Sequence, residues 1–145
     1  MPSPPRPRPA AAEALAAVAP LATRWIERLL AHHDPALTVP QYLALRAIER
    51  ERISGSELAR RTGVSGPAVS QLVSGLVAAG LVERRPDPDD RRRVLVEATE
   101  EGLAALQEDR RHRVGWLVSA MQRLPPEDQE VLARATAILR RLAEG

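Results

Sequence analysis

Acidic and arginine side chains are concentrated in one short segment of this chain, residues 86–93. The segment reads Pro-Asp-Pro-Asp-Asp-Arg-Arg-Arg and joins two apolar stretches, Leu81-Val82 and Val94-Leu95-Val96. Proline and aspartate favour turns, so this pattern predicts a β-hairpin with a charged tip. Guanidinium groups at such a tip can bind phosphates or enter the negative potential of a DNA minor groove. A solvated turn held by local ion pairs is the alternative interpretation.

Residues of this predicted hairpin can have different roles. Asp90 can pair with one arginine and hold the tip in shape, while another arginine of the tip projects into a minor groove. Arg84 and Arg85, at the base of the first strand, are candidate phosphate contacts.

A second set of candidate DNA-contacting residues lies in a predicted helix over residues 65–79. At about 100° per residue, one side of this helix is apolar and the other is small and polar. The apolar side comprises Val69, Leu72, Val73 and Leu76, and the outer face comprises Pro67, Ser70, Gln71, Ser74 and Ala78. The outer face carries no acid and is slim enough for a major groove, where Gln71 could pair with adenine and the serines with bases or phosphate. An ordinary solvated helix face would look the same when taken alone.

Short local signals predict the elements that position these residues. Ser54 and Glu57 have the spacing of a capping box, which predicts a short helix that ends at Gly63. Ser65 then caps the next helix, and Pro67 lies in its first turn, where a missing N–H is harmless. The amides at this cap could also bind a phosphate. Helix, tight turn, helix and hairpin together predict a winged helix-turn-helix.

Helical periodicity predicts four further helices around this unit. They cover about residues 10–33, 39–51, 100–122 and 127–143, and Pro20 should kink the first or make it restart. The residues expected to face inward in the second helix are Leu43, Ala47 and Ile48. Thr99 is expected to cap the third of these helices.

The overall composition is that of a globular protein and adds little to the case for a nucleic-acid partner. The formal net charge is +2, and all 21 lysine-or-arginine positions are arginine, which genome composition explains better than DNA contact does. The chain has no cysteine, which excludes disulfides and thiolate zinc sites within it. No apolar run approaches the roughly 18 residues of a membrane span, and no secretory signal is recognisable. We therefore expect a cytoplasmic protein without membrane contact.

The order of these motifs resembles that of MarR-type regulators, the family of multiple-antibiotic-resistance repressors. The resemblance is carried by Glu57-Leu-Ala59, Gly63-Val-Ser65, Gly80-Leu-Val-Glu-Arg84, Asp90-Arg-Arg92 and Thr99-Glu-Glu-Gly102. It implies a mainly α fold: a winged helix-turn-helix with a short β-hairpin wing, and a helical dimerisation region formed by the N- and C-terminal helices. It also implies that Arg92 enters the minor groove, beside Arg91, with Asp90 as its support. Many relatives have arginine where Gln71 stands, so the bases contacted here can differ.

Residues 1–9 hold five of the 13 prolines, which predicts an extended or disordered tail. The resemblance covers nearly all of the remaining chain, so residues 10–145 are expected to form a single domain. Within it, residues 38–98 would form the DNA-binding lobe, and residues 10–33 and 100–143 the dimerisation helices. A homodimer would bind a pseudo-palindromic double-stranded operator as a repressor released by a small-molecule effector.

Relatives of this type often bind small anionic or phenolic compounds in a crevice between the dimerisation helices and the DNA-binding lobe. The candidate residues for such a site are Arg24, Arg28, His32, His33, Tyr42 and Trp116. Trp116 lies on a helical stripe, which is more typical of a core or interface residue than of an effector contact. Histidines near a helix end often bond terminal carbonyls instead.

An enzyme is not expected, because the sequence holds no nucleophile–base constellation, no phosphate-binding glycine loop and no His-Glu metal motif. Three histidines and no cysteine give no recognisable zinc site, so neither metal nor cofactor is expected. Two other classes stay open. One is a winged-helix protein-interaction module without DNA binding, and the other is a metal- or small-molecule-binding protein whose main role is not transcription.

Overall fold

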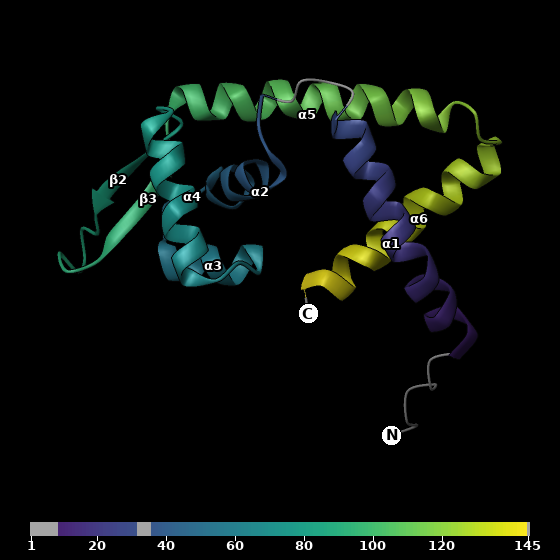
Figure 1. The fold of residues 1–145 in the computed structure, drawn as a ribbon, viewed down its shortest axis with the longest axis horizontal. Helices are drawn as coiled ribbons and strands as arrows, with labels where there is room; N and C mark the ends of the chain where they lie inside the picture. Colours follow the sequence, from purple (N-terminus) through teal and green to yellow (C-terminus); the bar gives the residue numbers. More distant parts are fainter. Residues whose placement is uncertain (1–8, 32–35, 145) are drawn as a thin grey trace. The chain divides into compact units, whose positions relative to one another are not determined.

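The computed structural model describes residues 9–31 and 36–144, and the chain divides into two compact units, residues 1–35 and 36–145. The elements in chain order are α1 (Pro9–Ala31), α2 (Val39–Ile48), β1 (Ile53–Ser54), α3 (Gly55–Thr62), α4 (Gly66–Ala78), β2 (Val82–Pro86), β3 (Val94–Ala98), α5 (Glu100–Met121) and α6 (Pro126–Glu144) (Figure 1). The described part of the chain is mainly helical with one small sheet, which confirms the predicted fold class. None of its helices combines the length and the apolar character needed to cross a membrane.

The first unit consists of α1 among the described residues. Pro20 lies inside this helix without dividing it, so the predicted restart is wrong. Proline removes one backbone hydrogen bond, and the Ala16 carbonyl that loses its donor is exposed, so water can replace it. The predicted tail lies outside the described residues except for Pro9, which begins α1. The large apolar side chains exposed on α1 are Leu15, Val18, Leu21, Trp25 and Ile26.

In the second unit, α2 begins at a capping box that sequence inspection missed. The Gln41 amide donates to the Thr38 hydroxyl at 3.4 Å, and the Thr38 amide donates to Gln41 Oε1 at 2.9 Å. The expectation that Leu43 faces inward is wrong, since it is 42% exposed. Ala44, Leu45 and Ile48 are buried instead. The helix contacts α3, α4, α5 and β3, and these neighbours cover a stripe centred on Leu45.

The short helix α3 has half of the predicted capping box. The Ser54 hydroxyl accepts from the Glu57 amide at 3.2 Å, as expected. The Glu57 carboxylate instead accepts from Arg60 and Arg61 and does not return to the Ser54 amide. Charge-assisted bonds to two guanidinium groups are stronger than one bond to a neutral amide. Gly63 ends the helix with a φ of 68°, a conformation that favours glycine.

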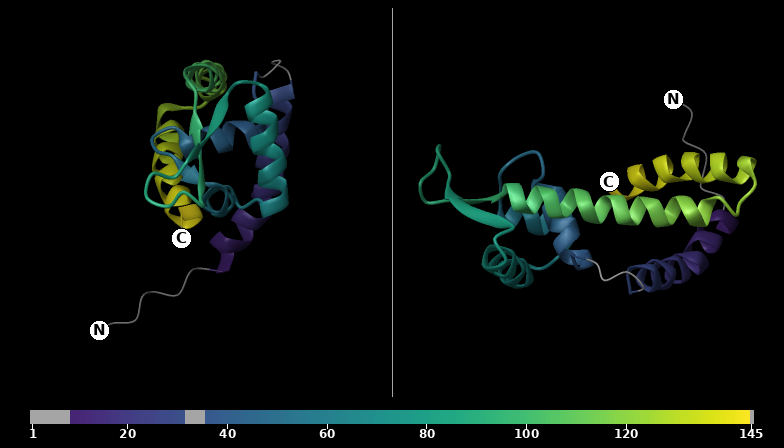
Figure 2. Two further views of the ribbon diagram at one scale, coloured as in Figure 1. Left: turned by 90° about the vertical axis from the view of Figure 1, so that its left-hand side faces the viewer. Right: turned by 90° about the horizontal axis from the view of Figure 1, so that it is seen from above.

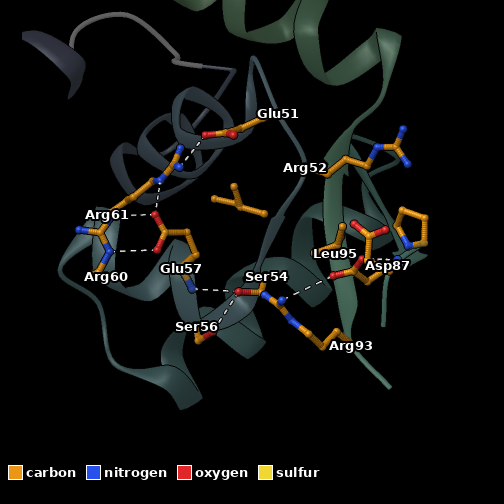
Figure 3. Close-up of a pocket in the computed structure, with 13 residues that line it drawn as sticks. Glu51, Arg52, Ser54, Ser56, Glu57, Arg60, Arg61, Asp87, Arg93 and Leu95 are labelled. Carbon is orange, nitrogen blue, oxygen red and sulfur yellow. Dashed lines mark hydrogen bonds and ion pairs between the residues drawn. The ribbon is translucent and has the colours of Figure 1, made fainter. Parts of the chain in front are cut away.

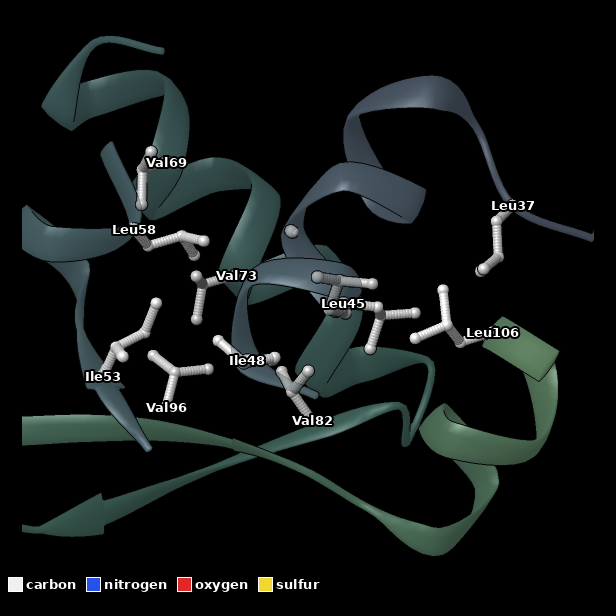
Figure 4. Close-up of a cluster of buried hydrophobic side chains, with 12 residues drawn as sticks. Leu37, Leu45, Ile48, Ile53, Leu58, Val69, Val73, Val82, Val96 and Leu106 are labelled. Atoms are coloured by element: carbon white, nitrogen blue, oxygen red, sulfur yellow. The ribbon is translucent and has the colours of Figure 1, made fainter. Parts of the chain in front are cut away.

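Three antiparallel strands form the sheet in the order β1-β3-β2. The register pairs Arg84 with Val96 and Pro86 with Val94, so the hairpin ladder ends at Pro86. The tip beyond it extends away from α2, α3 and α4 (Figure 2). The core lies between these helices, the sheet and the start of α5 (Figure 4). Its buried side chains are Leu37, Ala44, Leu45, Ile48, Ile53, Leu58, Val69, Val73, Leu76, Val82, Val96 and Leu106.

A close backbone approach joins the hairpin to α5. Thr99 caps this helix by accepting from the Gly102 amide at 3.0 Å, and its own hydroxyl donates to the Gly80 carbonyl at 2.7 Å. A Cβ atom on Gly102 would lie 1.9 Å from the Leu81 carbonyl oxygen, so only glycine fits there. Beyond Leu106, the large apolar side chains that are exposed on α5 and α6 are Val114, Leu117, Val118, Val131, Leu132, Ile138, Leu139 and Leu142.

Candidate nucleic-acid interface

The helix α4 presents the face that its sequence predicts. Val69, Val73 and Leu76 are buried and Leu72 is partly buried, whereas Pro67, Ser70, Gln71 and Ser74 are all exposed. None of the exposed residues is acidic, so nothing on this face repels a phosphate. The face is therefore free to approach nucleic acid.

Ser65 occupies the N-cap position of α4, but its hydroxyl makes no cap hydrogen bond. A cap hydroxyl normally accepts from the amide of the second or third helical residue. Here the second residue is Pro67, which has no amide hydrogen to give. The Ala68 amide at the third position does not donate to it either, so the cap bond predicted for Ser65 is absent. The first-turn amides of Gly66 and Ala68 have no acceptor within the helix.

The strand β2 is connected to the exposed face of α4 through Arg84. Its Nη2 donates to the Ser74 hydroxyl at 2.9 Å, so two candidate DNA-binding residues from different elements lie in contact. Arg85 lies on the opposite side of the strand, because successive side chains alternate. It donates to Glu83 at 2.6 and 2.9 Å. This hydrogen bonding raises the pKa of Arg85, and of the two arginines only Arg84 shares the side of α4.

The turn at the tip of the hairpin is organised by Asp90. Its Oδ1 accepts from the Arg92 amide at 3.1 Å and from Arg92 Nε at 3.2 Å, and its carbonyl accepts from the Arg93 amide at 2.8 Å. The hydrogen bonds from Arg92 lower the pKa of Asp90. The arginine paired with Asp90 is thus Arg92 itself and not a neighbour of it. Arg92 remains 92% exposed, and Arg91 is also exposed.

Asp87 is a structural residue of the tip that sequence inspection missed. It is 7% exposed, and it accepts from the Asp89 amide at 2.9 Å. Its carboxylate also lies 3.6 Å from Arg93 Nη1. An aspartate two residues before an amide donor is a common turn signal, and the spacing of Asp87 and Asp89 could have indicated this contact.

A shallow cavity of about 640 Å³ lies between the N-terminal part of α3 and the tip segment of the wing (Figure 3). Its lining includes Arg52, Arg60, Arg61 and Arg93 together with Glu51, Glu57, Asp87 and Asp89, so its charges balance. Hydrogen bonds from Arg60 and Arg61 lower the pKa of Glu57 to about 2. Arg61 also donates to the Ala47 carbonyl at 3.1 Å and to Glu51 at 2.6 Å, which ties α3 to α2. Arg60 and Arg61 thus make contacts within the fold. The cavity adds no net positive charge to the candidate interface.

The candidate effector residues are distributed over both units. Tyr42 is partly buried on α2, and the Arg113 guanidinium lies 4.3 Å from the centre of its ring. Trp116, partly buried, follows Arg113 on α5. Arg24 and Arg28 belong to α1 in the other unit, and His32 and His33 lie outside the described residues. Across the part of the chain that the structure describes, no group of three or more His, Cys, Asp or Glu side chains could hold a metal ion.

A helix-turn-helix whose outer face is free of acid, followed by an arginine-tipped hairpin, defines a winged-helix DNA-binding protein. Comparison with known proteins identifies the family within this class. The MarR family model matches residues 36–93. The transcriptional regulator AdcR of Streptococcus pneumoniae is 31% identical over 113 residues, which cover 74% of this chain and 77% of AdcR. The chain belongs to the MarR family of DNA-binding transcription regulators.

Solved structures agree with this assignment. The crystal structure of RV1404 from Mycobacterium tuberculosis matches with a TM-score of 0.77 and 25% identity, over 93% of this chain and 92% of that one. The structure of Bordetella bronchiseptica BpsR matches with a TM-score of 0.67 and 25% identity, over 88% and 94% of the two chains. The DNA binding of BpsR is regulated by 6-hydroxynicotinic acid.

Proposed function

We propose that this protein is a homodimeric repressor that binds a pseudo-palindromic DNA operator. The observation that carries the proposal is the pairing of an exposed, acid-free face on α4 with a turn that exposes Arg91 and Arg92. In this assignment α4 enters the major groove and the hairpin tip enters the adjacent minor groove. Residues 38–98 form the DNA-binding lobe, and residues 10–33 and 100–143 form the dimerisation region.

Base recognition is assigned to the exposed centre of α4. The Gln71 amide can donate to and accept from the edge of one adenine, and the Ser70 hydroxyl can bond a base or a phosphate. Ser65 and Pro67 lie at the N-terminus of the same helix, where amides favour a phosphate. Arg84 reaches the groove edge from β2 beside Ser74. A protein-interaction module without DNA binding has no need of a face without acids beside two exposed arginines.

Dimerisation is supported by apolar side chains that a single chain leaves exposed. On α6, Val131 is 56% exposed, Ile138 50% and Leu142 68%. Exposed apolar groups at this density favour burial against another surface. A second copy of the chain would also supply the second recognition helix that a two-fold operator requires.

The repressor is proposed to release its operator when it binds a small anionic or phenolic compound, as the regulation of BpsR by an aromatic acid suggests. Tyr42 provides an aromatic face, and Nη2 of Arg113 above it is buried and has no hydrogen-bond partner among the described residues. A buried guanidinium nitrogen without an acceptor favours a carboxylate or phenolate. Trp116 on the same helix can enclose such a ring, and Arg24, Arg28, His32 and His33 remain candidates from sequence.

DNA binding is tested by selecting duplexes from a random pool with the full chain and footprinting the selected site. We expect two protected half-sites about one helical turn apart. Arg92→Ala should weaken binding to this duplex, whereas Arg111→Ala, which removes the same charge from α5, should not. If no duplex is enriched, or if both variants bind equally well, the protein does not function in this way.

Effector release is tested on the complex of protein and selected duplex. Aromatic carboxylic acids and phenols should raise the melting temperature of the free protein and dissociate the complex. Tyr42→Ala should lose this response and retain DNA affinity. A metal ion that raises the melting temperature while no aromatic acid does so would contradict this assignment and favour a metal-binding role.

A further inference from the structure

Two sets of contacts, one inside the other, close the tip of the wing. The inner set is the turn from Asp90 to Arg93, in which the Arg93 amide donates to the Asp90 carbonyl. The outer set joins Asp87 to Arg93 through two contacts. The Asp87 amide donates to the Arg93 carbonyl at 3.0 Å, and the two side chains form an ion pair at 3.6 Å. The outer set therefore holds both ends of the segment that carries Arg91 and Arg92.

The outer set lies where the paired strands end and the turn begins. The last pair of the β2–β3 ladder is Pro86 with Val94, which is a non-hydrogen-bonded pair, so the missing amide hydrogen of proline costs this ladder no bond. Without a further contact, the turn beyond this pair could rotate relative to the strands. Asp87 follows Pro86 directly and supplies that contact. The side chain of Asp87 thus adds two contacts, one to Asp89 and one to Arg93, to the backbone bond that holds the turn on the strands.

Asp87 is also chemically unusual for a loop residue. It is one of two buried polar or charged residues in the described part of the chain, and its side chain is 10% exposed. A buried carboxylate is stable only where hydrogen bonds and an opposite charge replace water. One oxygen accepts from the Asp89 amide, and the other faces Arg93 (Figure 3). Asp89 by contrast is exposed, and its side chain has no partner among the described residues.

We propose that Asp87 is a positioning residue for DNA recognition by the wing, and that it sets the direction in which Arg91 and Arg92 leave the hairpin. This inference rests on the proposed function, because it concerns how the wing meets DNA. Asp90 fixes the turn internally, while Asp87 fixes that turn to the strands. Substitution of Asp87 or Arg93 leaves the inner turn and the backbone bond from the Asp87 amide to the Arg93 carbonyl in place, and removes the side-chain ion pair that orients the turn.

Removing the Asp87 carboxylate has opposite expected effects on DNA affinity, depending on whether its charge or its positioning role matters more. Loss of a carboxylate near phosphates strengthens binding if only electrostatics matters. Loss of the residue that aims two arginines weakens binding. Asp87→Ala and Asp89→Ala remove the same charge from neighbouring positions, and only the first removes a contact. The pair therefore separates the two effects.

The experiment measures affinity for the selected duplex over a salt series, for the parent, Asp87→Ala, Asp87→Asn and Asp89→Ala. We expect Asp89→Ala to bind as tightly as the parent or more tightly. Asp87→Ala should bind roughly tenfold more weakly, with a log affinity–log salt slope flatter by about 1, as for one lost arginine contact. Asp87→Asn keeps an oxygen for the Asp89 amide and should fall between them. It also serves as the readout if Asp87→Ala does not fold.

Two chemical probes distinguish a misdirected wing from general damage. Hydroxyl radicals cleave from the minor groove, and dimethyl sulfate methylates guanine N7 in the major groove. Asp87→Ala should lose the minor-groove protection and keep the major-groove protection, because α4 is unchanged. Loss of both protections, or affinity equal to that of Asp89→Ala, would overturn the inference. If the parent protein binds no duplex, the proposed function itself fails.

Discussion

The guanidinium of Arg84 donates to the Ser74 hydroxyl at 2.9 Å, and this bond connects strand β2 to the exposed face of helix α4. Both residues have the chemistry of independent DNA contacts when they are considered one at a time. In the folded chain, part of the hydrogen-bonding capacity of Ser74 is used by Arg84. The two residues should therefore act as one unit at the edge of the major groove.

The coupling of Ser74 and Arg84 can be measured in a double-mutant cycle. Ser74→Ala frees Arg84 to adopt other rotamers, and we expect a loss of about 0.5–1.5 kcal/mol in binding to the selected duplex. Once Arg84→Ala is present, Ser74→Ala should cost much less. Additive losses, determined by fluorescence anisotropy for all four proteins, would show that the two residues contact DNA separately.

Gln71 is predicted to select an adenine. Gln71→Ala should weaken binding to the selected duplex by about 1–3 kcal/mol and binding to random DNA much less. Ser70→Ala provides a neighbouring exposed variant for comparison. Equal losses on the two DNAs in competition assays would assign Gln71 to a phosphate or to the fold.

Arg92 and Asp90 are predicted to act together in the minor groove. Arg92→Ala should flatten the slope of log affinity against log salt by about 1, because one counterion-releasing contact is lost. Asp90→Ala should weaken binding although it removes a negative charge, because Asp90 accepts both from the amide and from Nε of Arg92. Tighter binding by Asp90→Ala together with an unchanged slope for Arg92→Ala would identify the tip as a solvated turn.

Gly102 is predicted to be required for the junction of the hairpin with α5. Gly102→Ala places a methyl group 1.9 Å from the Leu81 carbonyl oxygen, so the backbone must shift. We expect a loss of about 1–3 kcal/mol in unfolding free energy from urea titrations. Gly75→Ala, in a helix with no atom within 4 Å of the added group, should be neutral or stabilising. Similar values for the two variants would contradict the packing argument.

The ion pairs of Glu57 predict a specific pH dependence of stability. Its pKa is lowered from 4.5 to about 2 by hydrogen bonds from Arg60 and Arg61. A carboxyl whose folded pKa is depressed stabilises the fold above its unfolded pKa, and loses this effect as pH falls through the folded value. Glu57→Gln should therefore lower the denaturation midpoint at neutral pH, and the difference from the parent should vanish between about pH 4.5 and pH 2.

The control for this titration is Glu13→Gln, since Glu13 is exposed, lies beyond the first turn of α1 and forms no ion pair among the described residues. Its midpoint should follow that of the parent over the same pH range. A difference for Glu57→Gln that persists unchanged to pH 2 would mean that the side chain acts by packing and not by charge.

Local features of this fold could be predicted because they depend on residues a few positions apart. The bond from the Glu57 amide to Ser54, the left-handed Gly63 and the cap at Thr99 each involve only three or four consecutive residues. The two faces of α4 follow from helical period alone. The sequence by itself therefore determined the helix-turn-helix, the hairpin and the exposed, acid-free face of α4.

Features that depend on which elements meet in space were decided by the tertiary structure. Leu45 and not Leu43 is buried, because the neighbours of α2 cover one particular stripe. Arg84 bonds Ser74 ten residues away because β2 lies beside α4. The burial of Asp87 likewise depends on how the wing folds back upon itself. The sequence gives the chemical nature of such groups. Their burial and their partners depend on how distant elements pack. Packing therefore decides which charged side chains are held in ion pairs and which are exposed to solvent.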